Sequence, residues 1–285
     1  MMMMIMMMMM MIGAVNGDST PSHYFNVLDF GAKADHTTDN TEAFANAIKN
    51  ASEVNGGVVF VPPGLYVFDG HLEIPSGVTL KGSYHSVPSH DLRQGPLQND
   101  GSILIPREGR GNATKDPFLH VRANAAVASL VIYYDQQETV QIPVPYPWTI
   151  LMDGNNGAVT DVELLGSWRG INATGAGRHY IARVQGQPID LGVYIDQTYD
   201  IGRMENVHFN PWFSSSQPFM TYVSIDIRYF SLFFKTHTHT HIDSVINSHT
   251  VELLFSGVLI GNMFSTRSRL DTQSDIISSK RRLEV

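Results

Sequence analysis

The sequence of 285 residues contains no cysteine and carries little charge. The missing cysteines exclude disulfide scaffolds, zinc knuckles, iron–sulfur clusters and thiol nucleophiles. Charged residues make up 16% of the chain, whereas an ordinary globular domain has roughly 25%. The net charge is −8. This acidic balance argues against a nucleic-acid-binding protein, because such a protein needs a basic surface.

Long hydrophobic runs are scarce, and the one at the start of the chain is unusual. Met1 to Ile12 consists of Met apart from two Ile, and the small residues of Gly13 to Gly17 follow. One interpretation of residues 1–17 is a signal peptide, although the basic segment that normally precedes its apolar part is missing. The other is a low-complexity run of start-like codons that belongs to no fold. The run is too short to span a bilayer.

The far end of the chain, residues 235–285, shows no recognisable domain. Thr236 to His241 is a strict Thr-His repeat. It is either a metal-binding strand face or, as we favour, a translated simple-sequence DNA tract. The apolar stretch from Val251 to Phe264 is interrupted by polar residues and is too short for a membrane helix. We therefore leave residues 235–285 unassigned and expect no membrane span.

The middle of the chain is typical of many short strands joined by turns, as the 24 Gly and 14 Pro suggest. Asp39 or Asn40 is the expected N-cap of one amphipathic helix, whose buried stripe is Phe44, Ala47 and Ile48. The apolar segments that follow are short and are punctuated by Gly, Pro, Asn or Asp. The candidate strands include residues 58–61, 65–68, 72–74, 78–80, 103–105, 118–121, 130–134, 149–152, 159–165, 180–184, 192–195 and 204–209.

A weak repeat runs through three of these segments, which begin at residues 161, 181 and 204. Its period of about 20–25 residues is typical of a solenoid with several short strands in each coil. Strand alternation then predicts which side chains face the core and which form an outward polar strip. The predicted outward columns are Glu163/Arg183/Asn206, Leu165/Gln185/His208 and Ser167/Gln187/Asn210. The alignment also points Glu205 inward, which indicates a shift or a bulge in the third copy.

Three sequence blocks resemble the opening of the pectate-lyase-superfamily β-helix. They are Phe25–Asp35 continued by Thr38–Thr41, then Gly56–Tyr66, then Gly77–Gly82, in the family's order and at its spacing. The resemblance extends over roughly Phe25 to Phe213. It implies an all-β fold, a right-handed single-stranded parallel β-helix with an N-terminal capping α-helix, for which we assign residues 25–228. Counted from Val58 to Phe213 at about 23 residues a coil, this gives roughly six or seven coils.

The family includes proteins similar to polygalacturonases and rhamnogalacturonases, β-1,3-glucanases, epimerase-like proteins and phage tailspikes. The catalytic motifs of the polygalacturonase type are not found in this sequence, so they are not carried over. Hydrolysis of a glycoside needs two carboxyl groups. The carboxylates crowd between Asp161 and Glu205, and a polar strip with nearby aromatic rings suits a sugar chain. The predicted catalytic residues are Asp196, Asp200, Glu205 and Glu163, and the predicted substrate-binding residues are Arg183, Asn206, His208, Trp168, Tyr199 and Trp212.

The leading hypothesis is therefore a secreted glycoside hydrolase that acts on an extracellular polysaccharide. We expect no metal or other cofactor and no nucleic-acid partner. One alternative is a glycan-binding or structural β-helix without catalysis, and another is a polysaccharide lyase, for which Ca²⁺ would be expected. For each single carboxylate the simpler interpretation is a turn cap or an ion pair with a neighbouring Arg. A third interpretation is that the chain is an incomplete gene product, because a solenoid needs a terminal cap and nothing after Phe213 resembles one.

Overall fold

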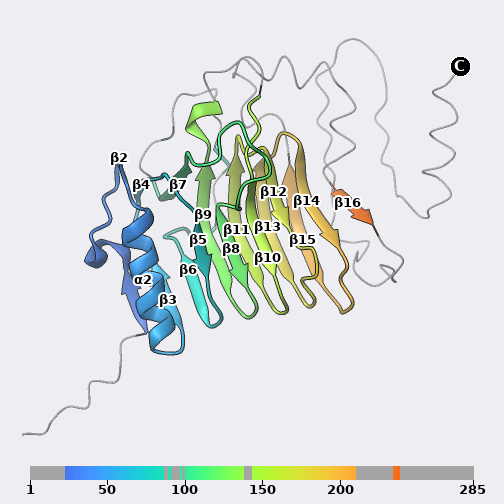
Figure 1. Cartoon of the computed structure of the whole chain (residues 1–285), viewed down its shortest axis with the longest axis horizontal. Coiled ribbons are helices and arrows are strands. Elements are labelled where there is room, and N and C mark those ends of the chain that lie inside the picture. The colour runs from blue at the N-terminus through green and yellow to red at the C-terminus, as the bar shows by residue number, and fades with distance from the viewer. Residues whose placement is uncertain are drawn as a thin grey trace, which may run out of the picture. The chain divides into compact units, whose positions relative to one another are not determined.

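The computed structural model describes residues 23–86, 89–90, 97, 100–137 and 143–209, together with the backbone of residues 234–237. Within these residues the chain winds into a parallel β-helix, as predicted (Figure 1). Strands from successive coils pair in parallel and form two sheets, which we call sheet A and sheet B.

Sheet A has ten strands. Its main path runs in the order β1-β3-β6-β9-β11-β13-β15, and β2, β4 and β7 join it as a branch that ends on β9. The bounds are β1 Tyr24–Asn26, β2 Asp35–Asp39, β3 Gly57–Phe60, β4 Gly64–Phe68, β6 Val78–Lys81, β7 Ser102–Pro106, β9 Ala126–Tyr133, β11 Ala158–Leu165, β13 Tyr180–Gln187 and β15 Arg203–Phe209.

Sheet B has six strands in the order β16-β14-β12-β10-β8-β5. Their bounds are β5 Leu72–Ile74, β8 Leu119–Arg122, β10 Trp148–Asp153, β12 Arg169–Asn172, β14 Leu191–Asp196 and β16 Phe234–His237. Two residues of the Thr-His repeat lie in β16, which pairs with β14. The rest of the repeat, the predicted boundary at residue 228 and the segment 1–17 lie outside the described residues.

The coils are unequal in length. Residues 58, 79, 126, 158, 180 and 203 occupy equivalent positions in successive coils. The coils that begin at residues 58, 158 and 180 follow a period of 21–23 residues, whereas the two coils between residues 79 and 158 carry long insertions. Within the described residues five coils therefore run from residue 58 to residue 203, where a uniform period predicts six or seven up to residue 213, and the pairing of Tyr24 with Val58 begins one more coil before them.

The interior is filled by columns of stacked aliphatic side chains. In one column of sheet B the register aligns Leu119, Ile150, Ile171 and Val193, which are all buried. Burial of these columns excludes water from the interior and supplies the main driving force for winding the solenoid.

Each long strand of sheet A turns a corner at a single residue. Ser129, Asp161, Arg183 and Asn206 have left-handed backbones with φ of 63°, 54°, 53° and 52°. The residues on both sides of them are paired in register, so these four residues stack at the same corner. A non-glycine residue in this conformation costs roughly 1–2 kcal/mol. The stacked contacts must offset that cost in every coil.

The predicted alignment of the outward columns is partly wrong. Val162 pairs with Val184, whereas the sequence alignment placed Leu164 opposite Val184. The difference is two residues, which leaves the inward–outward alternation unchanged, so the hydrophobic pattern cannot detect it. As a result Glu163 lies beside Gln185 and not in the column of the predicted arginine.

The corner also interrupts the alternation that the prediction assumed. Arg183 and Asn206 sit at the corner itself and not on a flat strand face. Met204 and Val207 are both largely buried although they are three positions apart, since the left-handed residue lies between them. Glu205, which the sequence alignment pointed inward, is half-buried beside this corner.

The one α-helix among the described residues lies where predicted. Helix α2 spans Thr41–Glu53 and buries Phe44, Ala47 and Ile48 together with Ala51. The carboxylate of Asp39 accepts hydrogen bonds from the backbone N–H and the hydroxyl of Thr41, at 3.0 and 2.6 Å. Asp39 thus satisfies the start of the helix.

Asn40 occupies the N-cap position and is almost fully buried, but its side chain makes no capping hydrogen bond. Its side-chain oxygen accepts from the Lys33 backbone N–H at 2.6 Å, and its amide donates to the Thr38 carbonyl at 2.7 Å and to the Val67 carbonyl at 3.3 Å. Asn40 therefore links the segment before α2 to strand β4 through hydrogen bonds to the backbone of Lys33, Thr38 and Val67.

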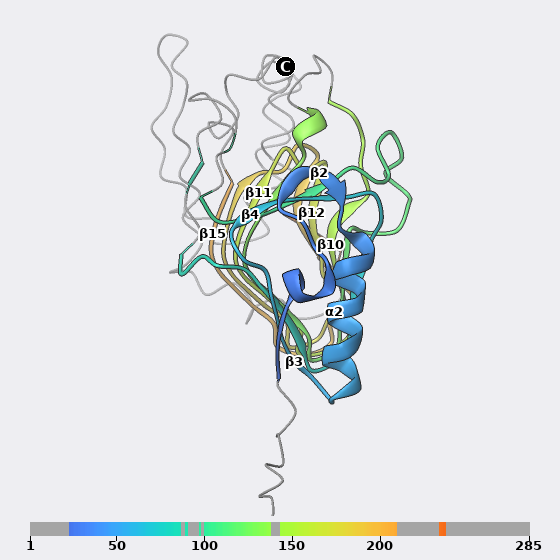
Figure 2. The ribbon, with the colours of Figure 1, turned by 90° about the vertical axis from the view of Figure 1, so that its left-hand side faces the viewer.

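Helix α2 takes the place of a sheet-B strand in the first coil. It connects β2 to β3, just as β5 connects β4 to β6, and it packs against β5 and β6. Figure 2 shows α2 along the side of the coils, while the short helix η2 (Val27–Phe30) lies over their mouth. The buried side chain of Val27 joins the core there. The predicted cap thus consists of two pieces, with α2 covering the edge of sheet B.

Candidate functional site

The outer side of sheet A is largely closed over β4, β7, β9 and β11. A second apolar cluster lies on it, outside the solenoid interior, and Tyr84 and Leu97 from the segment between β6 and β7 pack against it. Its buried members are Val67, Ile103, Ile105, Val131, Tyr133 and Leu165. This part of the outer side of sheet A is therefore covered by the protein's own chain.

The outer face of sheet B carries polar and aromatic side chains in place of an apolar cover. One column aligns Glu73, His120, Leu151, Asn172 and Tyr194 from β5 to β14. Neighbouring strands are about 4.8 Å apart, so adjacent members of a column lie within side-chain reach. We call this surface the sheet-B face and define it by Glu73, His120, Arg122, Trp148, Asp153, Arg169, Asp190, Tyr194 and Asp196.

A charged cluster around Arg122 occupies the part of the sheet-B face next to α2. The Arg122 guanidinium donates to both carboxylate oxygens of Glu73 at 3.0 and 3.2 Å, and to Asp153 Oδ2 at 2.6 Å. His120 Nε2 lies 3.2 Å from the same Asp153 oxygen. The hydrogen bonds from Arg122 lower the pKa of Glu73, so this carboxyl is ionised at neutral pH. The cluster brings two carboxylates and an imidazole to one guanidinium.

An aromatic pair lies on the same face. Trp148 of β10 and Tyr194 of β14 stack with their ring centroids 6.2 Å apart, and the Arg169 guanidinium lies 5.6 Å from the Trp148 ring centroid. Arg169 Nε in turn donates to Asp190 Oδ2 at 2.6 Å. Such a platform offers flat apolar area with charged groups at its edge.

Of the predicted catalytic residues, only Asp196 lies on this face. It ends β14, and the Tyr194 hydroxyl donates to its Oδ2 at 2.9 Å, which raises the pKa of the tyrosine. Asp200 lies in the exposed turn that follows and pairs with Arg178 at 3.1 Å. Tyr199, in the same turn, is 83% exposed.

Glu163 lies on the closed side of sheet A and is fully buried. The backbone N–H of His90 donates to Glu163 Oε1 at 2.9 Å, and the imidazole Nδ1 contacts Oε2. On its other side the imidazole Nε2 lies 3.3 Å from both oxygens of Asp100. Burial raises the pKa of Glu163. Burial alone would lower the pKa of His90, but the two carboxylates outweigh it and raise this pKa.

The remaining predicted residues of sheet A have separate partners. Arg183 makes two hydrogen bonds of 2.7 Å to the two carboxylate oxygens of Asp161, its neighbour at the corner. The Tyr180 hydroxyl donates to Glu205. Asn206 is exposed at the corner, and His208 lies half-buried in register with Gln185.

The predicted aromatic binding residues do not form one group with these side chains. Trp168 precedes β12 and is half-buried against the core. Trp212 lies outside the described residues. The nine predicted residues that the structure describes are therefore spread over sheet B, a turn, the corner of sheet A and its closed side, and they do not come together at one site.

The described residues contain neither a metal-binding cluster nor a helix that could span a membrane. Among them, no group of three or more His, Asp or Glu side chains converges as a metal site would. Within the same residues, no helix has the length and apolar character needed to cross a membrane. The expectation that no metal cofactor is needed stays a prediction.

Comparison with known proteins supports the resemblance that the sequence blocks indicated. Residues 24–103 match the family described as rhamnogalacturonase A/epimerase, pectate lyase-like. This part of the chain is pectate-lyase-like. The matched segment contains α2 and Glu73, whereas the rest of the sheet-B face lies beyond it.

Curated relatives share only a short part of this chain. It is 42% identical over 66 residues to alginate lyase 7 of Azotobacter vinelandii, which is 21% of this chain and 8% of that protein. Over 64 residues it is 41% identical to a mannuronan C5-epimerase of the same organism, which is 22% of this chain and 5% of that protein. The chain thus spans less than a tenth of the curated relatives it matches.

Solved structures resemble a larger part of this chain at low identity. An exopolygalacturonase from Thermotoga maritima matches with a TM-score of 0.48 and 17% identity, covering 67% of this chain and 53% of that one. The A-module of a mannuronan C-5 epimerase from Azotobacter vinelandii matches with a TM-score of 0.43 and 16% identity, covering 65% and 57%.

Sequence reasoning missed most of the sheet-B face. The signal that would have found it is the outward position in the short predicted strands, such as Glu73 between Leu72 and Ile74 or His120 between Leu119 and Val121. The repeat was traced only in the strands that now form sheet A. Long insertions separate the first sheet-B strands in the sequence, so these strands do not follow the same period.

Proposed function

We propose that the protein binds a polysaccharide chain along the sheet-B face and hydrolyses its glycosidic bonds, acting on a glycan outside the cell. The observation that carries this proposal is the stacked pair of Trp148 and Tyr194 on the same face as the Arg122 cluster. Aromatic rings present flat apolar area to the C–H face of a sugar ring, and the neighbouring charged groups hydrogen-bond its hydroxyls.

The charges on the sheet-B face favour a neutral sugar chain over a polyuronate. The guanidinium of Arg122 is shared between Glu73 and Asp153, and that of Arg169 is paired with Asp190. Both guanidiniums on this face are therefore already neutralised by carboxylates. Elimination from a uronate needs a cation that neutralises the substrate's own carboxylate. This observation supports hydrolysis over β-elimination.

Hydrolysis needs one group that donates a proton and one that is ionised. On the described part of the sheet-B face, His120 and Glu73 stand next to each other in register and would supply such a pair, and His120 Nε2 also lies 3.2 Å from Asp153 Oδ2. His120 is the proposed proton donor to the leaving oxygen, and Asp153 orients the imidazole. Glu73, kept ionised by Arg122, is the proposed carboxylate that activates water.

Binding without cleavage is the second candidate function. It is favoured because Arg122 donates a hydrogen bond to each carboxylate oxygen of Glu73 and lowers the pKa of this carboxyl. A carboxylate held in this way is a weak base for the activation of water. Under this alternative the Arg122 cluster only hydrogen-bonds sugar hydroxyls.

The test uses the full chain with neutral β-1,3-glucan and galactan and with acidic polygalacturonate and alginate. We expect saturable binding to a neutral polysaccharide and the appearance of new reducing ends. Trp148→Ala should weaken binding about tenfold, the equivalent of about 1.4 kcal/mol. Tyr199→Ala, which removes an exposed ring from the neighbouring turn, should leave binding unchanged.

The catalytic part of the proposal is tested with Asp153→Asn and His120→Gln. Each should reduce the rate of reducing-end formation by about 10²–10⁴-fold, the usual contribution of a positioned acid or base, while binding is retained. Binding without any new reducing ends would favour the second candidate. Absence of binding to all four polysaccharides would overturn both.

A further inference from the structure

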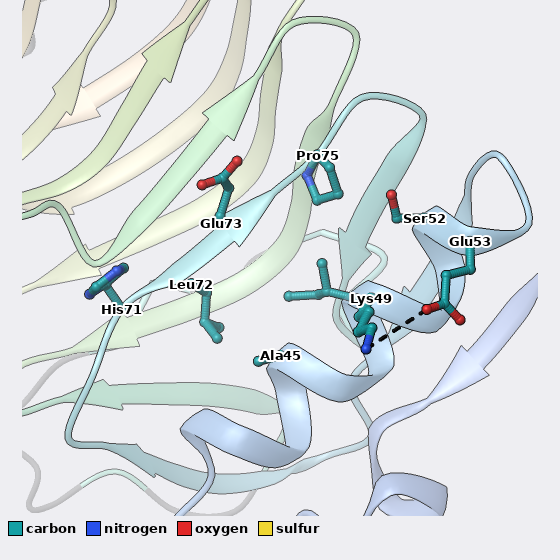
Figure 3. Close-up of a pocket in the computed structure, with 9 residues that line it drawn as sticks. Ala45, Lys49, Ser52, Glu53, His71, Leu72, Glu73 and Pro75 are labelled. Carbon is teal, nitrogen blue, oxygen red and sulfur yellow. Dashed lines mark ion pairs between the residues drawn. The ribbon is translucent and has the colours of Figure 1, made fainter.

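A groove lies between α2 and β5, at the end of the sheet-B face. Figure 3 shows β5 with His71, Leu72 and Glu73 along one side and α2 with Lys49 and Glu53 along the other. The groove has a volume of about 470 Å³. Small-ligand sites generally measure roughly 300–1,000 Å³, so it has room for the end of an oligosaccharide but not for a folded partner.

The groove is continuous with the sheet-B face through one side chain. Glu73 lines the groove and at the same time makes both hydrogen bonds to Arg122. A sugar ring in the groove would therefore lie next to the Arg122 cluster.

The sheet-B face ends at this groove because α2 replaces the next strand. β5 is the last strand at this end of sheet B, and α2 packs beside it. The exposed side of α2 carries Ala45, Lys49 and Glu53, which line the groove opposite β5. A chain lying along the sheet-B face thus meets the helix as a wall.

The chemistry of the groove suits a sugar. Its floor includes the buried side chains of Ile48 and Leu72, and its rim includes the hydroxyl of Ser52 and the ion pair of Lys49 with Glu53 at 3.9 Å. An apolar floor under a polar rim matches the C–H face and the hydroxyl edge of a pyranose. Lys49 is paired with Glu53 and Glu73 is paired with Arg122, so the rim offers no unpaired cation to an anionic ligand.

We infer that the groove between α2 and β5 is the terminal subsite for a neutral polysaccharide, and that the protein therefore binds its substrate from a chain end. The inference rests on the proposed function, since the sheet-B face must hold the rest of the chain. The inference goes beyond the proposed function because it states that α2 makes the protein prefer the end of a polysaccharide chain.

The test fills the groove without touching the sheet-B face. Ala45→Trp places a large ring in the groove, and the matched control Asn46→Trp places the same ring on the neighbouring exposed position of α2, outside the groove. The probes are neutral β-1,3-gluco-oligosaccharides and galacto-oligosaccharides that are unmodified or carry a bulky fluorescent tag at either the reducing or the non-reducing end.

We expect the tag at one end to abolish binding to the unaltered protein and the tag at the other end to have no effect. Ala45→Trp should weaken binding of the unmodified probes about tenfold, and Asn46→Trp should not. Equal melting temperatures of the two variants establish that both are folded.

The outcomes separate this inference from the proposed function. If Trp148→Ala weakens binding but Ala45→Trp does not, or if both tagged probes bind as well as the unmodified ones, the terminal subsite is wrong and the sheet-B face stands. If neither Trp148→Ala nor Ala45→Trp affects binding, or if no probe binds, the proposed function fails and the inference fails with it.

Discussion

The ion pair at the corner of sheet A offers a direct test of how the coils are held together. Arg183 and Asp161 stack in adjacent coils, and both residues have left-handed backbones. Two hydrogen bonds of 2.7 Å join them, and Asp161 is only 8% exposed. Arg183→Asn removes the charged partner and keeps a residue type that tolerates this backbone conformation.

The expected loss is the difference of two effects. Hydrogen bonds to a charged group contribute about 1.5–3 kcal/mol, and the lower end applies because the Arg183 side chain is 47% exposed. Relief of left-handed backbone strain returns part of that, since Asn adopts this conformation more readily. We therefore expect Arg183→Asn to lower the free energy of unfolding by about 1 kcal/mol, or the melting temperature by roughly 2–4 °C.

The assay is thermal unfolding followed by circular dichroism, with Asn206→Gly as the control. The control changes the same corner one coil further on, where the native residue already tolerates the backbone, and should shift the melting temperature by less than about 1 °C. An Arg183→Asn variant that melts with the unaltered protein would refute the view that this stacked pair stabilises the coils.

Three further predictions concern buried polar groups. The midpoint of the His90 titration, measured by NMR, should lie above about 6.5 and should fall in the Glu163→Gln variant. The protonated imidazole should stabilise the fold below about pH 6.5, and this stabilisation should be lost as the pH rises through the pKa of His90 in the folded state. A midpoint that Glu163→Gln leaves unchanged would contradict this. Burial lowers the pKa of His179, so stability should decrease as pH falls below about 6.5, measured as a melting temperature at pH 5 and 7; His179→Gln should reduce that decrease. Asn40→Ala should cost about 2–4 kcal/mol in urea unfolding because it leaves buried partners unpaired, whereas exposed Asn50→Ala should cost little.

The part of the fold that the sequence predicts well is the part governed by short-range rules. The stripe of Phe44, Ala47 and Ile48 with Asp39 before it specifies α2, because helix periodicity and capping are local. The family resemblance adds the solenoid, which the parallel register confirms.

The register of the coils is less predictable, for a physical reason. In a strand only the parity of a position decides whether its side chain is buried, so Leu164 and Val162 are equally good partners for Val184 on hydrophobic grounds. What selects Val162 is the left-handed corner at Asp161 and Arg183. Asp and Arg are not residues that mark such a corner in a single sequence, whereas Gly would have been.

The candidate site was predicted least well, and the structure explains why. Winding the solenoid requires similar apolar residues at every inward position, so Val162, Val184 and Val207 form a uniform column in sheet A and produce a visible repeat. Winding makes no demand on the outward positions. The outward column that begins with Glu73 and His120 accordingly contains a different residue type in every coil.

This asymmetry has a consequence for where function can be built. In a solenoid the inward positions must carry similar apolar residues, whereas the outward positions can carry any residue type. The coils therefore hold different outward side chains at fixed spacings of about 4.8 Å on a rigid support. On sheet A that freedom is used to seat the protein's own segment over Tyr133 and Leu165, with Glu163 buried beneath it. In the described coils of sheet B no such cover is seated, and α2 closes only the edge. The same winding therefore gives one covered face that stabilises the protein, on sheet A, and a second face, on sheet B. This difference is the physical basis for our proposal that a polysaccharide binds on sheet B.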